Sequence, residues 1–465
     1  MTKRLTLPLL LALAACTVGP DYRRPAAEVV PAAYKELAGW KPATPRDDAP
    51  RGEWWRVFND PVLDRLEQQV APGNQNVRAF EAAYRQAVAL VGEAQAGLFP
   101  VLGVSPAVSR NSLSGGGGSV NRVSNTQAFT GKAFTEYSLE GSASWTLDVW
   151  GSIRRQIEAQ GAAAQASAAD LANALLSAQA LLATDYFDLR AADSLTRLLQ
   201  DTVQQYRLAL QIAQNQYSAG IVSRADVVTA DAQLKTTQAQ LVGVGVTRAQ
   251  FEHAIAVLTG RPPAEVSIAP APLAHVVPVA PAGLPSALLE RRPDIAAAER
   301  TMAQQNALIG VAVAAYYPTI TLTGLFGYAG NPLSQLFTAA NQIWSLGAAA
   351  NETVLQGGLR AATLAAAHAG YDQSVATYRQ TVLTAFQQVE DDLAALRILE
   401  QQAAAVAAAV AASQAAVTVT LNEYRAGTVA YTAVITEQTT LLGNEQAALA
   451  VQQSRFLASV GLIAA

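Results

Sequence analysis

Few residues of this chain have the types and spacing that catalysis or metal binding requires. The three histidines, His253, His275 and His368, are far apart in the sequence and lack the ligand spacing of an ordinary zinc site. The acidic run at residues 390–392 falls in an expected long helix, where a solvated face explains it better than paired acid–base chemistry. We therefore expect no metal site, no catalytic residue and no enzymatic activity.

The single cysteine, Cys16, follows a short leader sequence. Lys3 and Arg4 precede an apolar run, and small residues stand directly before Cys16. This pattern is typical of a signal peptide over residues 1–15, and it resembles a bacterial lipobox, whose cysteine becomes the lipidated first residue of the mature protein. An ordinary signal peptide with an incidental cysteine is the alternative. Thr17 follows in place of an aspartate, which favours the outer membrane. A covalent lipid on Cys16 is the only cofactor expected.

The composition excludes several classes of protein. In 465 residues the charged fraction is only 15 %, the hydrophobic fraction is 51 %, and the net charge is −4. Disorder is excluded, and so is the basic footprint of a nucleic-acid-binding protein. No run of about 18 apolar residues is present, so we expect no membrane-spanning helix. A chain of this kind that crosses a membrane would have to use a β-barrel.

The chain carries two copies of one pattern. Three residue pairs share a spacing of 218, and the Tyr-Ser-Ala-Gly and Tyr-Arg-Ala-Gly motifs share a spacing of 207. The pairs are Glu81 and Glu299, Gly92 and Gly310, Pro100 and Pro318, then Tyr217 and Tyr424, Gly220 and Gly427. We place the copies at 61–261 and 286–465, after a lipidated N-terminal segment, 16–60. A Pro-rich linker, 262–285, separates them.

Each copy predicts a helix, a β-hairpin and a long helical hairpin, in that order. The β-hairpins cover residues 101–147 and 319–351. Residues 137–147 and 319–328 alternate apolar with polar side chains, and the first run has the length of a tilted membrane strand. Residues 101–110 and 342–351 are weaker strand candidates, and 111–132 predicts a flexible exposed loop. A soluble hairpin packed on helices is the alternative.

A membrane barrel built from these strands would have to be shared between chains. Four strands cannot close a barrel, because single-chain barrels start at about eight strands. Open strand edges are not tolerated in lipid. Three protomers would supply twelve strands.

The helical hairpins, 151–260 and 358–462, are unusually long. Residues 151–217 contain no proline and would span roughly 100 Å at 1.5 Å per residue. Leu175, Leu182 and Leu189 recur every seven residues, as in a coiled coil. Residues 359–423 form an equally long and more alanine-rich stretch. The return helices are expected at 224–259 and 431–462. A plain coiled-coil scaffold is the alternative.

Three segments carry a family resemblance. They are residues 16–25 (CTVGPDYRRP), 54–63 (WWRVFNDPVL) and 288–299 (LLERRPDIAAAE). In this order, on a duplicated chain, they resemble the TolC-like outer-membrane factors, lipoprotein (NodT/OprM-type) branch. The resemblance implies an α+β membrane protein that forms a homotrimer, with a 12-stranded β-barrel in outer-membrane lipid and an α-helical periplasmic tunnel.

The resemblance also implies a function and partners. The trimer would be a passive exit duct for small molecules in a tripartite efflux system. It would dock a periplasmic adaptor (membrane fusion) protein and receive substrate from an inner-membrane pump, of the RND type. A duct for type I protein secretion and a periplasmic coiled-coil scaffold lipoprotein are the alternatives. The sequence does not identify the substrate.

The resemblance further implies a gate at the two helix turns. The family's latch, a hydrogen bond from a tyrosine to an aspartate, would here join Tyr424 to Asp226. The alternatives are a helix N-terminal acid for Asp226 and a packing aromatic for Tyr424. A latch of this kind is worth only a few kcal/mol at most, which suits release on adaptor docking. The turn residues expected to contact the adaptor are Gly220, Ser223, Gly427 and Thr428.

The sequence departs from the best-known pattern at this gate. The latch arginine is replaced by Val429, and the two constricting aspartates by Ala433 and Thr436, although Glu437 is near. We therefore expect a gate with fewer polar links, held more by packing.

Overall fold

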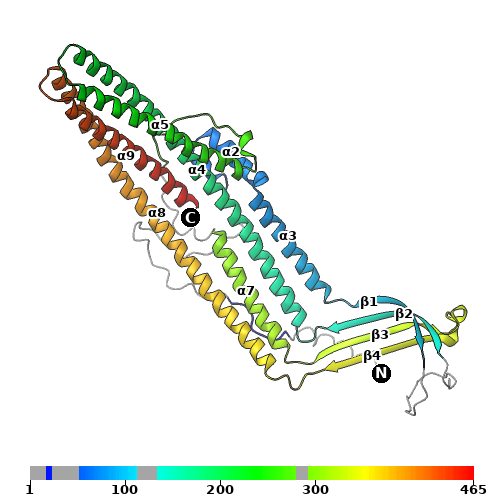
Figure 1. Ribbon diagram of the computed structural model, residues 1–465. Helices are drawn as coiled ribbons and strands as arrows, with labels where there is room; N and C mark the ends of the chain where they lie inside the picture. Colours follow the sequence, from blue (N-terminus) through cyan, green and yellow to red (C-terminus); the bar gives the residue numbers. More distant parts are fainter. Residues whose placement is uncertain (1–16, 24–51, 113–132, 279–291, 465) are drawn as a thin grey trace. The chain divides into compact units, whose positions relative to one another are not determined.

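The computed structural model describes residues 17–23, 52–112, 133–278 and 292–464 (Figure 1). The predicted signal peptide, Cys16 and most of the 111–132 loop lie outside the described residues. The chain divides into two compact units, and each takes segments from both sequence copies. The strand unit comprises Met1–Pro25, Arg85–Gln165 and Arg300–Ala376; the helical unit comprises Ala26–Tyr84, Ala166–Glu299 and Thr377–Ala465.

Each copy contains a helix, a β-hairpin and a long helical hairpin, in that order. The short 3-10 helix η1 (Trp54–Phe58) precedes the first copy. That copy contains α2 (Pro61–Gly73), α3 (Gln75–Ala96), β1 (Val101–Asn111), β2 (Phe134–Leu147), α4 (Ser152–Ser218) and α5 (Arg224–Leu258). The second contains α7 (Pro293–Ala314), β3 (Thr319–Gly330), β4 (Gln342–Asn351), α8 (Leu359–Arg425) and α9 (Tyr431–Ala464). Short 3-10 turns are η2 (Pro263–Glu265), η3 (Leu333–Gln335) and η4 (Ala339–Asn341).

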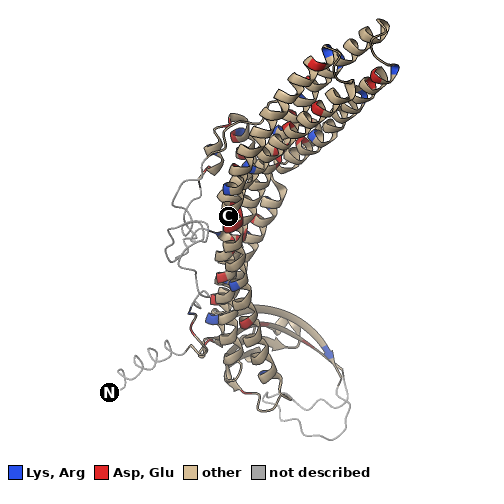
Figure 2. Cartoon of the chain, turned by 90° about the vertical axis from the view of Figure 1, so that its left-hand side faces the viewer, with Lys and Arg blue, Asp and Glu red and all other residues tan. Residues whose placement is uncertain are grey.

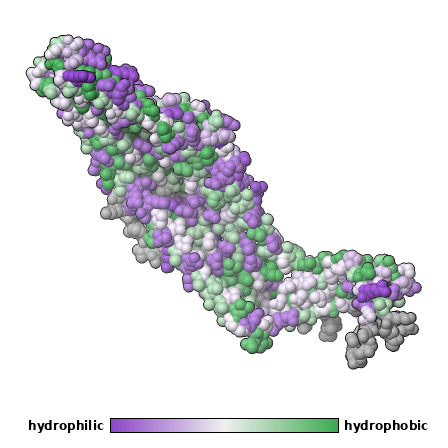
Figure 3. All heavy atoms as spheres, viewed as in Figure 1, coloured by the Kyte–Doolittle hydropathy of each residue, from purple (hydrophilic) through white to green (hydrophobic). Residues whose placement is uncertain are grey.

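The four strands form one antiparallel sheet in the order β1-β2-β3-β4. One row of opposed residues crosses it as Val104, Gly141, Phe326 and Trp344. Since strand side chains alternate between faces, this row places most of the apolar residues of the four strands on one face. Val104, Phe326 and Trp344 are exposed in the single chain, and the visible side of the sheet is mostly pale or green in Figure 3. An apolar face of this kind suits lipid.

The long helices form as expected. Both α4 and α8 contain 67 residues, which corresponds to roughly 100 Å of helix each. The sequence alone predicts no segment long and apolar enough to span a membrane. That expectation is wrong as far as length and composition go, because α8 and α9 each contain such a stretch. Alanine accounts for this in α8, since runs such as residues 403–409 raise its hydropathy without adding large side chains. Acidic and basic residues are distributed along the helices, with few on the strands (Figure 2).

The main core of the helical unit joins the two copies. Phe187 of α4 stacks on Phe456 of α9, with ring centroids 4.7 Å apart, and Phe58 lies 4.8 Å from Phe187. The Tyr186 hydroxyl donates to the carboxylate of Asp60 at 2.5 Å, and Asp60 also caps α2 by accepting from two backbone N–H groups. Buried aromatic pairs add stability beyond their buried area. The cluster therefore fixes α2, α4 and α9 to one another.

Candidate functional site at the helix turns

The two helix turns of the helical unit share one backbone geometry. After α4, Gly220 has φ +73°, and Ile221 donates to the carbonyl of Gln216 at 2.9 Å. After α8, Gly427 has φ +75°, and Thr428 donates to the carbonyl of Glu423 at 3.0 Å. Helices commonly end in this way, with a glycine in the left-handed conformation and a backbone hydrogen bond from the next residue back to the last helical turn. Glycine is needed at both positions because other residues are strained at such φ values.

The side chains after the two turns differ. Before α5, the Ser223 hydroxyl accepts from the Asp226 N–H, and the Asp226 carboxylate accepts from the Ser223 N–H at 3.0 Å. This is a capping box, which satisfies two free donors at a helix start. Before α9, the residues 207 positions further on are Ala430 and Ala433, which offer no such groups. The first return helix therefore has a capping box, which Ala430 and Ala433 cannot form at the second.

The second turn is instead held by buried aromatic residues. Tyr424 and Tyr431 are both nearly fully buried, and their ring centroids lie 5.2 Å apart. They pack with Ala209, Ala213 and Ala230 of the first helical hairpin. The equivalent of Tyr424 in the first turn, Tyr217, is 47 % exposed. The tyrosine at the second turn thus links the two helical hairpins, whereas its counterpart is about half exposed.

The predicted hydrogen bond between Tyr424 and Asp226 is absent, and this corrects the latch geometry. Within the described residues the buried Tyr424 hydroxyl has no hydrogen-bond partner. Asp226 directs its carboxylate to the N–H and hydroxyl of Ser223. Burial and, second, the Asp226 charge raise the pKa of Tyr424, so the two groups are close enough to interact through space. The capping box holds one oxygen of the Asp226 carboxylate against Ser223.

The four residues expected to contact an adaptor are all exposed: Gly220, Ser223, Gly427 and Thr428. Ile221, which lies beside Gly220, is 68 % exposed. Val429, which replaces the expected latch arginine, packs against the buried tyrosine cluster. The turns therefore offer a solvent-facing surface that includes apolar side chains.

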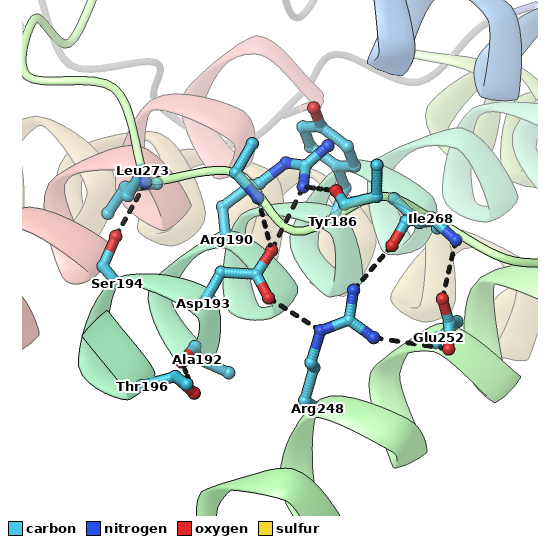
Figure 4. Close-up of polar contacts among 12 residues, drawn as sticks. Tyr186, Arg190, Ala192, Asp193, Ser194, Thr196, Arg248, Glu252, Ile268 and Leu273 are labelled. Atoms are coloured by element: carbon cyan, nitrogen blue, oxygen red, sulfur yellow. Dashed lines mark hydrogen bonds and ion pairs between the residues drawn. The ribbon is translucent and has the colours of Figure 1, made fainter. Parts of the chain in front are cut away.

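A charged network that sequence reasoning missed fixes the linker between the copies (Figure 4). The buried Asp193 carboxylate accepts from Arg190 at 3.1 Å, from Arg248 at 2.7 Å and from the Ala271 N–H at 3.0 Å. Arg248 also donates to the Ile268 carbonyl at 2.6 Å. A buried charge is tolerated only when paired and hydrogen-bonded in this way. The linker, expected as a mere connection, is thus bound to α4 and α5.

Glu67 is a second group that the sequence did not single out. It is fully buried in α2, and both its carboxyl oxygens lack a hydrogen-bond partner among the described residues. Burial raises the pKa of Glu67 to about 9, so this carboxyl is neutral at pH 7. Nothing in its spacing along α2 distinguishes it from a surface glutamate.

In the strand unit, the residues that follow Cys16 are docked by Arg155 of α4. Its buried guanidinium donates to the carbonyls of Val18 and Gly19, both at 3.3 Å, and to Asp21 at 2.9 Å. Gly19 has φ +95°, and an added Cβ would lie 2.5 Å from the Cα of Gly310. The segment therefore lies where the hairpin ends and α4 begins. The sequence alone does not indicate that Gly19 and Gly310 are in contact.

A four-stranded sheet with an apolar face, joined to paired 67-residue helices in a duplicated chain, defines a protomer of a TolC-like outer-membrane channel. The pattern of the outer membrane efflux protein family matches residues 66–261 and 284–465. The chain belongs to this family, and it is an outer-membrane efflux channel protein.

Individual relatives agree with this assignment. The probable efflux pump outer membrane protein TtgC of Pseudomonas putida is 28 % identical, over 97 % of this chain and 92 % of that protein. Nodulation protein T of Rhizobium leguminosarum bv. trifolii is 30 % identical, over 85 % of this chain and 82 % of that protein. The solved structure of the outer-membrane channel OprN is 29 % identical, with a TM-score of 0.84, and covers 97 % of this chain and 98 % of that one.

Proposed function

We propose that three copies of this chain form the exit duct of a tripartite efflux system, with a twelve-stranded barrel in the outer membrane and a helical tunnel in the periplasm. One observation carries the proposal. The sheet has an apolar face, yet among the described residues neither β1 nor β4 pairs with a strand on its outer edge. An open edge is not tolerated in lipid, and four strands cannot close a barrel. Other copies of the chain must complete it.

A lipid on Cys16 supplements the barrel as a second membrane attachment. The support is the docking of Val18, Gly19 and Asp21 by Arg155, directly after the hairpin ends. A lipid chain on the adjoining cysteine would then enter the membrane near the periplasmic ends of the strands. Acyl chains hold a protein at a membrane but do not make it span.

The exposed turns form the surface that meets the periplasmic adaptor, and an inner-membrane pump of the RND type supplies the substrate. Support comes from the solvent-facing residues Gly220, Ser223, Gly427 and Thr428, and from relatives named as efflux pump components. The duct itself performs no chemistry. Substrate choice therefore lies mainly with the pump and adaptor.

The gate at the turns closes by packing. Tyr424 and Tyr431 hold the second hairpin against the first, while Asp226 stabilises the first return helix as a cap. Adaptor docking would open the duct by separating the two hairpins at this contact. An interaction of a few kcal/mol is small enough for a docking partner to overcome.

Planar-bilayer conductance of the purified trimer tests this proposal. The wild type should conduct weakly, and Tyr424→Ala should raise the conductance by removing the packed ring. Tyr217→Ala is the matched control at the exposed counterpart and should leave conductance unchanged. Tyr424→Phe should also behave as wild type, because it keeps the ring and removes only a hydroxyl that has no hydrogen-bond partner among the described residues.

Other outcomes would point elsewhere. If Tyr424→Phe and Asp226→Ala each raised conductance as much as Tyr424→Ala, a direct hydrogen-bonded latch would operate in the trimer. No conductance from folded wild type and variants would overturn the duct and favour the scaffold lipoprotein. A duct for type I protein secretion would conduct as well, and it would require an ABC exporter as the pump partner.

A further inference from the structure

The registers of the two β-hairpins preserve the sequence duplication. Val101 of β1 lies opposite Ser144 of β2, and Thr319 of β3 lies opposite Asn351 of β4. Val101 and Thr319 differ by 218, and Ser144 and Asn351 differ by 207. These are the two spacings found outside the sheet, between Pro100 and Pro318 and between Gly220 and Gly427. Each residue of β1 thus has a counterpart in β3, and residues 135–144 of β2 have counterparts in β4.

The joint between β2 and β3 shows how one copy pairs with the next. Gly141 of β2 lies opposite Phe326 of β3 in an antiparallel ladder. In a barrel shared between chains, the following joint brings β4 of one protomer to β1 of another. That joint also connects the second strand of one copy to the first strand of the next. The counterparts of Gly141 and Phe326 there are Ala348 of β4 and Val108 of β1.

We propose that β4 pairs antiparallel with β1 of a second copy of the chain in one defined register, with Ala348 opposite Val108. The paired stretch runs from Asn351 opposite Ser105 to Ser345 opposite Asn111. The inference rests on the proposed trimeric barrel and specifies its subunit interface. The partner is a second copy because its β1 edge repeats the edge that β3 offers to β2.

The faces of the sheet support this register independently. Ala348 lies opposite Leu322, which in turn lies opposite Trp145, and all three are on the apolar face of the sheet. Val108 lies opposite Tyr137 on the same face. The proposed pairing therefore keeps apolar side chains facing lipid across the joint. A slip of one residue would turn one strand's apolar side chains to the other face. Slips of two residues keep the face and are the real competitors; they place Ala348 opposite Pro106 or Arg110.

Disulfide trapping distinguishes the three registers. Ala348→Cys is combined in turn with Val108→Cys, Pro106→Cys and Arg110→Cys, and outer membranes are mildly oxidised. Residues directly opposed in an antiparallel pair lie within disulfide reach, about 4.5–5.5 Å between Cα atoms. Ala349→Cys with Ala107→Cys repeats the proposed register at the neighbouring pair. Cys16 is the only native cysteine, so each single-cysteine variant reports the background.

We expect the Val108 pair and the Ala107 pair to convert several-fold more chain into a covalent trimer, reversed by reductant, than either slipped pair. An internal control is Gly141→Cys with Phe326→Cys, which should form a disulfide within one protomer and leave its size unchanged. A dominant cross-link at Pro106 or Arg110 would overturn the register while leaving the trimer standing. If the internal control closes but no pair between protomers does, the shared barrel itself is wrong.

Discussion

The two helix turns have the same backbone but are stabilised by different side chains. Gly220 and Gly427 adopt nearly the same φ, and each follows a 67-residue helix. The first turn is stabilised within itself, because Ser223 and Asp226 cap the return helix that they begin. The second turn has alanines at those positions and depends on Tyr424 and Tyr431 packing across to the other hairpin.

This difference shows which of the two turns responds when the hairpins separate. Local capping bonds stay intact when a hairpin moves as a body, so the first turn keeps its structure. The packing of Tyr424 against Ala213 and Ala230 connects different hairpins and is lost on separation. The duplicated chain therefore has two turns with the same backbone. The second of them loses its stabilising tyrosine contacts when the two hairpins separate.

The largest effect is expected from removing the ring that makes this coupling. Tyr424→Ala should destabilise the second turn by about 3 kcal/mol, as for other buried aromatic truncations. Amide hydrogen exchange at the C-terminal end of α8 and at the start of α9 would then speed up, because local opening of this turn becomes less costly.

Tyr217→Ala is the control for this variant. Its ring is 47 % exposed, so exchange at the ends of α4 and α5 should change by less than about 0.5 kcal/mol in opening free energy. Equal effects of the two variants would show that Tyr217 is buried in the assembled protein and that the turns are stabilised alike.

A smaller effect is expected from exchanging the caps. Ala430→Ser with Ala433→Asp would place the capping box on α9, and Ser223→Ala with Asp226→Ala would remove it from α5. Each change should shift helix-start stability by about 1 kcal/mol, in opposite directions. Exchange rates at the first amides of α5 and α9 measure both. If the added box fails to protect α9, its first turn is already satisfied by neighbours in the trimer.

The sequence was sufficient to predict the elements because their signals are local and repeated. Alternation marked β2 and β3, the absence of proline marked α4, and Gly220 and Gly427 marked the turns. The side-chain contacts were harder to predict from the sequence. The resemblance pairs Tyr424 with Asp226, but the choice between a hydrogen bond to Tyr424 and a cap on Ser223 depends on rotamers, which the sequence does not specify. The Asp193 network and the Arg155 dock join residues far apart in sequence, so no spacing indicates them.

The smallest predicted effect, that of Tyr424→Phe, decides between packing and a latch. Among the described residues the buried hydroxyl has no hydrogen-bond partner, so Tyr424→Phe breaks no bond there. Removal of the hydroxyl should therefore leave exchange at the second turn unchanged or slow it slightly. If exchange instead accelerates, the hydroxyl gains a partner in the trimer. Asp226 is the candidate partner, because its charge already acts on the pKa of Tyr424. Its carboxylate would then have to leave Ser223, so closure of the gate would weaken the cap of the first turn, and the two turns would be coupled.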